Sequence, residues 1–213
     1  MIGRLLGVVA VVTAVILPEG SYAWAGSPTD DLRGYVDRVI AVLEASDMKG
    51  PGLSAERHHA VRTIAGEGMD FLEASRRALG GHWEGRTPDE RARFVALFTA
   101  LIDTAYLSKV AGYDGERLHY DGESVNGGDA VVNARVIEKD GDVTPIEFRL
   151  IRGTDDRWRV WDATFEGVSL VGNYRAQFTR IMRSSSFQQL LGRLESRTRN
   201  GSSDYRSRGT SLV

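Results

Sequence analysis

The sequence contains no cysteine, only three lysines and only five prolines among its 213 residues. The absence of cysteine excludes disulfide bonds, thiolate catalysis, cysteine-ligated zinc and an N-terminal lipoprotein anchor. The formal net charge is −2, so no overall basic field attracts nucleic acid. Hydrophobic residues make up 42% and charged residues 26%, which is typical of a globular domain. A disordered chain, a collagen and a polytopic membrane protein are therefore excluded.

The N-terminus has the pattern of a secretory signal peptide. Arg4 supplies a positive start, and Leu5 to Leu17 is a run of 13 uncharged residues. Such a run is too short to cross about 30 Å of hydrocarbon as a helix. Ala23-Trp24-Ala25 then offers a small-x-small cleavage site. We expect residues 1–25 to be a signal peptide and the chain to be exported, with an uncleaved anchor as the alternative.

Helical periodicity dominates the chain before residue 112 and after residue 169. The first apolar stripe lies in residues 30–45, and others follow Ser54, Phe71 and Thr87-Pro88-Asp89-Glu90, the last of which has the form of a capping box. Two further helices are expected after Ser169 and up to residue 196. Residues 197–213 are rich in Arg, Ser and Gly, so we expect a single domain over 26–196 and a disordered tail over 197–213. The first stripe has these members: Leu32, Tyr35, Val36, Val39, Ile40 and Leu43.

Four strand-like runs lie between these helical regions, at residues 116–121, 129–138, 143–152 and 157–165. Turn-forming pairs such as Gly127-Gly128 and Asp140-Gly141 separate them. Short connections favour antiparallel neighbours, so the runs predict a four-stranded meander. The order of helices, sheet and helices predicts an α+β fold.

The sequence contains no recognisable catalytic or metal-binding motif. The four histidines lack zinc-binding helix spacing, and the glycine pairs match no phosphate-binding loop. The sequence around Ser169 lacks the last glycine of a nucleophile elbow, so Ser169 is better explained as a helix N-cap. Asp162 and Glu166 could form a catalytic acid–base pair. We instead expect both carboxylates to lie near the end of the sheet and to face water or pair with Arg175. We therefore expect no enzyme, no cofactor and no metal.

One composite stretch is more specific than any of these motifs. It starts at Trp158-Arg159-Val160-Trp161-Asp162, continues through Glu166-Gly167-Val168-Ser169-Leu170 and ends near Phe178 and Ile181. Further residues upstream and downstream occur in the order and approximate spacing of one family. Together they resemble the toluene-tolerance (MlaC) family of periplasmic phospholipid-binding proteins over about residues 55–196. The supporting positions are Leu79-Gly80, Trp83, Thr87-Pro88, Arg91, Phe94, Phe98, Tyr106, Tyr113, Asn173-Tyr174-Arg175, Gln177, Leu190, Leu191 and Leu194.

The resemblance implies a helical layer packed against a curved four-stranded antiparallel sheet, similar to the NTF2 fold, around a deep apolar pocket for acyl chains. It implies a carrier that binds phospholipid and moves it between an inner-membrane ABC transporter complex and an outer-membrane lipoprotein complex, which maintains lipid asymmetry. Some relatives are associated with hopanoid biosynthesis, so a hopanoid-associated carrier is one alternative. An NTF2-like small-molecule-binding protein or enzyme, or an adaptor for partner proteins, are the others.

Within that family picture, we expect the acyl chains to lie between the helix that starts at Pro88 and the inner face of the sheet. Ordinary core packing is the alternative for each predicted residue. Arg175 could reach a phosphate, but we expect it to pair with Glu166 or Asp162 and to fix the pocket mouth. The predicted lipid-binding residues are Phe94, Phe98, Tyr106, Val132, Phe148, Val160, Val168 and Tyr174.

Cleavage after Ala25 gives the first prediction. The exported protein should begin at Gly26, because the small-x-small site follows the apolar run at the usual position. The intact mass of protein purified after export measures this directly. A mass that includes residues 1–25 would contradict the prediction.

Overall fold

The computed structural model describes residues 26–45, 55–110 and 113–210, which form one α+β domain. The predicted signal peptide lies outside these residues. Among the described helices, none combines the length and apolar character needed to cross a membrane. In chain order the elements are α1 (Pro28–Glu44), α2 (Ala55–Gly68), α3 (Phe71–Leu79), η2 (Gly80–His82), α4 (Pro88–Val110), β1 (Arg117–Asn126), β2 (Asp129–Ile137), β3 (Val143–Arg152), β4 (Trp158–Phe165), β5 (Val168–Ser169), α5 (Leu170–Ser184) and α6 (Phe187–Thr210).

The sheet is an antiparallel meander in the order β1-β2-β3-β4-β5. This confirms the predicted meander, with one short strand more than the four expected. The extra strand forms because Glu166 and Gly167 both adopt positive φ, 49° and 80°, and turn the chain back onto the end of β4. The first strand is longer than predicted. The sequence did not indicate its second half, from Glu123 to Asn126, because these residues are exposed and show no apolar alternation.

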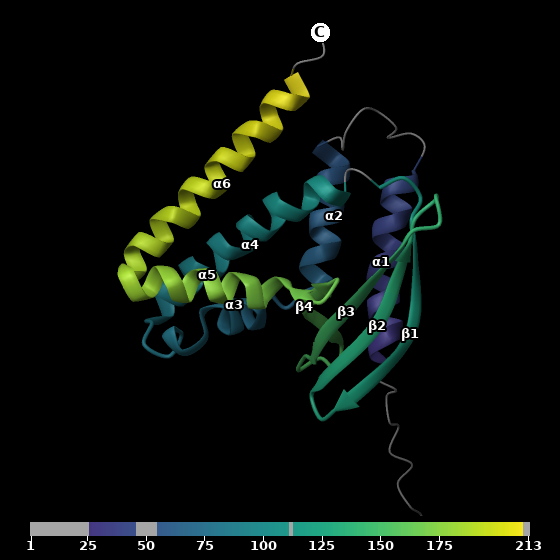
Figure 1. Ribbon diagram of the computed structural model, residues 1–213, viewed down its shortest axis with the longest axis horizontal. Helices are drawn as coiled ribbons and strands as arrows, with labels where there is room; N and C mark the ends of the chain where they lie inside the picture. The colour runs from purple at the N-terminus through teal and green to yellow at the C-terminus, as the bar shows by residue number, and fades with distance from the viewer. Residues whose placement is uncertain (1–25, 46–54, 111–112, 211–213) are drawn as a thin grey trace, which may run out of the picture.

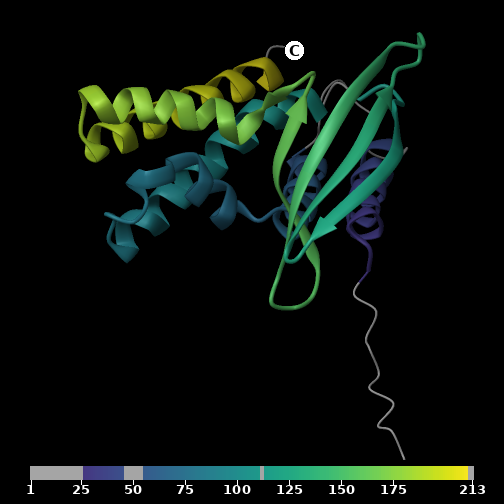
Figure 2. The ribbon, with the colours of Figure 1, turned by 60° about the horizontal axis from the view of Figure 1, so that its bottom comes forward.

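The helices lie in two groups on either side of the last long strand. Figure 1 shows α1 and α2 along one face of the sheet, while α3, α4, α5 and α6 form a block beside it. Figure 2 shows the same division with the sheet in front of α1 and α2. Each group has its own apolar core. The first core is Leu32, Ala130, Val132, Leu150, Trp158 and Val160, and the second contains Phe94, Phe98, Trp161, Phe178, Leu190 and Leu194 among others.

A β-bulge in β4 connects the two cores. Leu150 pairs with Val160 and Arg149 pairs with Asp162, so Trp161 is the additional residue. Val160 contributes to the core under α1, whereas Trp161 contributes to the helical core. The backbone oxygen of Val160 also accepts a hydrogen bond from Asp70 N at 2.8 Å, which attaches the α2–α3 junction to the edge of the sheet.

Asp162 anchors the start of α5. Its side chain is 1% exposed, and its two oxygens accept hydrogen bonds from Ser169 Oγ at 2.6 Å and Val171 N at 2.9 Å. Ser169 Oγ accepts in turn from Gly172 N, so the predicted N-cap is confirmed. The expectation that Asp162 faces water or pairs with Arg175 is wrong, because the Ser169 hydroxyl and the Val171 amide at the N-terminus of α5 satisfy the carboxylate instead.

The C-terminal segment differs from the predicted disordered tail. Helix α6 continues to Thr210, through residues expected to be irregular. No proline interrupts residues 187–210, and arginine is among the better helix formers, so the backbone can stay helical without an apolar face.

The capping box at the start of α4 gives the second prediction. Glu90 N donates to Thr87 Oγ1 at 3.2 Å, and Thr87 N donates to Glu90 Oε2 at 3.1 Å, as the sequence predicted. Thr87→Ala leaves one N-terminal amide without its acceptor and should lower the unfolding free energy by about 1 kcal/mol. We expect a melting temperature about 2–4 °C lower. Thr87→Ser keeps the hydroxyl and serves as the control, and equal melting temperatures for the two variants would contradict the capping role.

Candidate functional site

An apolar cavity of about 420 Å³ lies between the α1–α2 pair and one face of the sheet. Nearly all of its lining is aliphatic or aromatic. Helix α1 supplies one wall, α2 the second and the strands β2, β3 and β4 the third. The residues from α1 are Leu32, Tyr35, Val36, Val39, Ile40 and Leu43.

Helix α1 is fixed to the sheet near its N-terminal end and stands over the cavity further along. Asp31 Oδ2 accepts a hydrogen bond from Trp158 N at 2.8 Å, and Thr29 N donates to Glu123 Oε2 at 2.7 Å. Leu32 then packs into the core against the sheet. Val36 and Val39, further along the same stripe, are only half-buried, since the cavity occupies the space in front of them.

Helix α2 closes the cavity by packing tightly on α1. Gly68 lies against the ring of Tyr35, where a Cβ on Gly68 would be 2.7 Å from Tyr35 Cγ. Ile64 and Ala65, on the same helix, face the cavity. Only a residue without a side chain allows this approach, so Gly68 sets the distance between the two helices.

The sheet wall follows from strand alternation. Ile146, Phe148 and Val136 project from one face, and β4 adds Val160 and Ala163 to the same wall. The far face of β2 and β3 carries Arg135, Glu147 and Arg149 and is polar there. The apolar face of the sheet therefore faces the apolar stripe of α1, and the cavity is the space left between them.

The cavity reaches the surface at the end of the sheet where β1 begins and β4 ends. Phe165 lines the cavity and is 39% exposed, and Val168, its partner across the β4–β5 turn, is 60% exposed. Ile137 and Val143 form an exposed pair at the same end of the sheet. The rim around the mouth is therefore apolar on its sheet side.

Tyr35, Tyr113, Glu116 and Arg117 are the titratable side chains that line the cavity among the described residues, and the last three lie together at the start of the sheet. Tyr113 donates its hydroxyl to Glu44 Oε1 at 3.1 Å. Burial raises the pKa of the Tyr113 phenol above its usual value, and the hydrogen bond to Glu44 adds to the rise. The phenol therefore stays neutral and acts as a hydrogen-bond donor at the mouth.

The predicted lipid-binding residues are divided among several places. Phe148 and Val160 line the cavity, while Val132 lies fully buried in the adjoining core against α1. Val168 is on the exposed rim. Phe94, Phe98 and Tyr174 belong to the helical core, where their rings contact one another and Phe178. The side chain of Tyr106 lies outside the described part of the structure.

Sequence analysis missed the α1 stripe as a wall of the site. All six of its apolar residues line the cavity, but the pattern of a helix that packs on a core is the same as that of a helix that covers a cavity. The signal that could have separated them is Gly66-Glu67-Gly68 in the next helix, because a glycine in a helix indicates close approach of a neighbour.

The chemistry of the cavity is that of apolar binding. Asp162 is occupied by the start of α5, and no group of three or more His, Asp or Glu among the described residues is placed to hold a metal. The expected pair between Arg175 and Asp162 or Glu166 is not formed in the described structure; the Arg175 guanidinium lies against Gly80 instead. The cavity mouth is therefore not fixed by that pair.

The fold and the cavity together define an α+β domain that encloses an apolar site between a helix pair and a curved antiparallel sheet. The sequence profile of the family described as MlaC protein matches residues 33–196, so the chain belongs to the MlaC family. A relative from Haemophilus influenzae, the intermembrane phospholipid transport system binding protein MlaC, is 24% identical over 193 residues, which cover 87% of this chain and 88% of the relative.

A solved structure has a similar fold. The phospholipid-binding protein from Ralstonia solanacearum, determined in complex with a phospholipid, superposes with a TM-score of 0.74 and 20% sequence identity. The match covers 83% of this chain and 99% of that one. The recognition of the family and of the α+β fold from sequence is confirmed.

The contact between Gly68 and Tyr35 gives the third prediction. Gly68→Ala forces α2 away from α1 and should lower the unfolding free energy by about 1–3 kcal/mol through overpacking. Gly66→Ala is the matched control, since a Cβ at Gly66 meets nothing within 4 Å and alanine favours the helix. Chemical denaturation measures both variants. Equal stability of the two would show that Gly68 does not set the spacing of the helices.

Proposed function

We propose that this protein is a periplasmic lipid carrier that holds phospholipid acyl chains in the cavity between α1, α2 and the sheet. The observation that carries the proposal is the nearly continuous apolar lining of that cavity, formed by Val36, Ile40, Phe148 and Val160 among others. Its volume of about 420 Å³ is within the range of about 300–1,000 Å³ usual for ligand sites. Membership of the MlaC family supports the same function.

Burial of acyl chains supplies ample free energy for such a carrier. Each methylene removed from water contributes about 0.8 kcal/mol, so one chain of about 16 carbons contributes roughly 13 kcal/mol gross. Part of this is offset by ordering the chain and by opening the cavity. Val36, Val39 and Ile40 are half-buried along the cavity, while Leu43 at the end of α1 packs against Val61 of α2, so this half of α1 is held mainly by α2.

The mouth of the cavity suits a polar headgroup. Arg117 offers a guanidinium at the point where the apolar lining ends, and the Tyr113 hydroxyl, which donates to Glu44, keeps its oxygen there as an acceptor. We infer that the headgroup stays at this rim while the chains extend toward Phe148 and Val160. The exposed apolar residues Phe165 and Val168 would then border the route by which the chains enter.

Transport requires that the carrier exchange its cargo with membrane-bound partners. We infer an inner-membrane ABC transporter complex and an outer-membrane lipoprotein complex as the two partners, and maintenance of membrane lipid asymmetry as the result. The family and the name of the Haemophilus influenzae relative, which places that protein in an intermembrane phospholipid transport system, support this inference. Export through a signal peptide over residues 1–25 would place the carrier between the two membranes.

Filling the cavity gives the fourth prediction. Val160→Trp puts a large ring into the space that the chains occupy, so lipid that co-purifies with the protein should fall by about tenfold or more. Ile40→Trp, on the opposite wall and at a half-buried position, should act in the same way with less strain. Native mass spectrometry after mild purification measures the bound lipid, and lipid extraction identifies it as phospholipid or hopanoid.

Two controls separate the cavity from the helical core. Val125→Trp makes the same change at a position that is 53% exposed and outside the cavity, so bound lipid should stay unchanged. Phe98→Leu weakens the aromatic contacts with Phe94, Tyr174 and Phe178 and should lower the melting temperature without changing the lipid stoichiometry. Normal lipid content in folded Val160→Trp and Ile40→Trp, or its loss in Phe98→Leu alone, would contradict the proposed site.

A further inference from the structure

Positive charge is concentrated in the last quarter of the chain. Residues 170–213, which include α5 and α6, contain eight arginines against one glutamate and one aspartate. The remaining 169 residues contain 19 basic and 27 acidic side chains. A chain with a formal net charge of −2 is thus composed of an acidic body and a basic helical hairpin.

The arginines of this hairpin also differ from the others in their partners. Of the 15 described arginines outside it, 12 form ion pairs, which include Arg62 with Asp103 and Arg77 with Asp129. None of the six arginines whose side chains are described in α5 and α6 appears in an ion pair with a described carboxylate. Glu195, the one acidic residue of α5 and α6 whose side chain is described, pairs with Arg93 of α4. Arg199 Nε donates to the backbone oxygen of Glu195 at 3.4 Å and the Arg175 guanidinium lies against Gly80, so the described charges of Arg180, Arg183, Arg193 and Arg197 are the ones left without an ion pair or hydrogen bond in the described structure.

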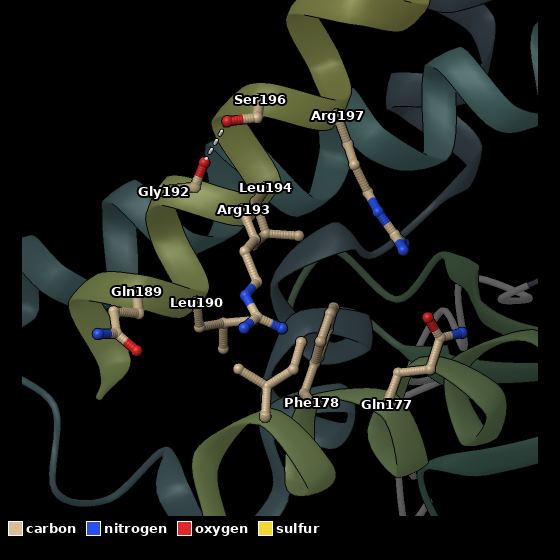
Figure 3. A pocket seen from close by; sticks show the side chains of 10 residues that line it. Gln177, Phe178, Gln189, Leu190, Gly192, Arg193, Leu194, Ser196 and Arg197 are labelled. Carbon is tan, nitrogen blue, oxygen red and sulfur yellow. Dashed lines mark hydrogen bonds between the residues drawn. The ribbon is translucent and has the colours of Figure 1, made fainter. Parts of the chain in front are cut away.

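A groove of about 640 Å³ runs between α5 and α6, and two of these arginines line it. Arg193 and Arg197 are one helical turn apart on α6, and Figure 3 shows both side chains extending from α6 toward α5. Gln177 and Gln189 add amide groups to the lining. The groove shares no residue with the cavity under α1, so its role is independent of the cargo site.

The floor of the groove is apolar but already closed. Leu190, Leu194 and Phe178 are 0%, 2% and 3% exposed, because α4 and the helical core cover them. The anchoring side chains of an amphipathic partner helix would find no hole to fill there. What remains accessible is the pair of guanidinium groups and the amides, held above a surface of low dielectric constant that strengthens their attraction for an anion.

We propose that the α5–α6 groove is a docking site for the phosphate headgroups of an anionic phospholipid bilayer, with Arg193 and Arg197 as the residues that bind the phosphate. Guanidinium groups match phosphate in geometry and bind it through paired hydrogen bonds. Clusters of four to eight basic residues on a helix are typical of attachment to anionic lipid surfaces. The acidic body of the protein would be repelled from the same surface, so only the hairpin faces the bilayer.

Co-sedimentation with vesicles tests the proposal. Protein purified after export is mixed with vesicles of equimolar phosphatidylglycerol and phosphatidylcholine, and with vesicles of phosphatidylcholine alone. We expect binding to the anionic vesicles only, weakened by added salt. The double variant Arg193→Gln with Arg197→Gln should lose about tenfold or more in affinity. Its content of co-purified lipid should not change, which keeps this result separate from a failure of the cavity.

The matched control is Arg180→Gln with Arg183→Gln, which removes the same charge from α5 at exposed positions outside the groove. It should lose at most about threefold, since it changes only the long-range field. Equal losses in the two double variants would overturn the groove as the site. Equal binding to both kinds of vesicle, or none to either, would overturn the anionic bilayer. Competition by millimolar inorganic phosphate would indicate a free-phosphate site, and binding of an acidic peptide without vesicle binding would indicate a protein partner; each result overturns the proposal.

Discussion

Strand β4 has to bury both of its faces, and the rest of the structure depends on how its bulge achieves this. Val160 packs under α1, Trp161 packs among α3, α4 and α5, and Asp162 accepts the hydrogen bonds that start α5. The carbonyl of Val160 also binds the α2–α3 junction. Three consecutive residues thereby join the sheet, the helical block and the helix pair. In a regular strand Asp162 would lie on the same face as Val160, and the bulge instead places its carboxylate on the side of α5, next to Trp161.

The cavity is a consequence of this arrangement. Helix α1 is held at its N-terminal end by Asp31 and Leu32, and it packs on α2 through Tyr35 with Gly68 and through Leu43 with Val61. The bulge fixes where α2 ends, because Asp70 is bonded to β4. The N-terminal end of α1 and the C-terminal end of α2 are therefore held against the sheet. The C-terminal half of α1 covers a space that no side chain fills.

Much of the fold was predictable because local patterns and tertiary packing agree. The meander, the capping box at Thr87 and the Ser169 cap followed from alternation and turn or cap residues. The location of the site was less accessible. Phe94, Phe98 and Tyr174 have the same spacing as residues that line a pocket, and whether a stripe meets a core or a cavity depends on contacts distant in sequence. Asp162 was misjudged for a similar reason, since its partners are the cap hydroxyl of Ser169 and the amide of Val171, at the start of a helix that begins only after a turn. The extension of α6 to Thr210 was not predicted, because its sequence has no helical spacing of apolar residues.

The central claim is that acyl chains lie between α1, α2 and the sheet rather than within the helical block. The most direct test is a crystal structure of the protein loaded with a phospholipid whose acyl chains carry bromine, because anomalous scattering locates the bromine atoms without reference to the protein chain. The account predicts bromine peaks beside Phe148, Val160 and Ile40. Peaks between α4 and α5, beside Phe94 and Phe98, with the space under α1 empty, would contradict it.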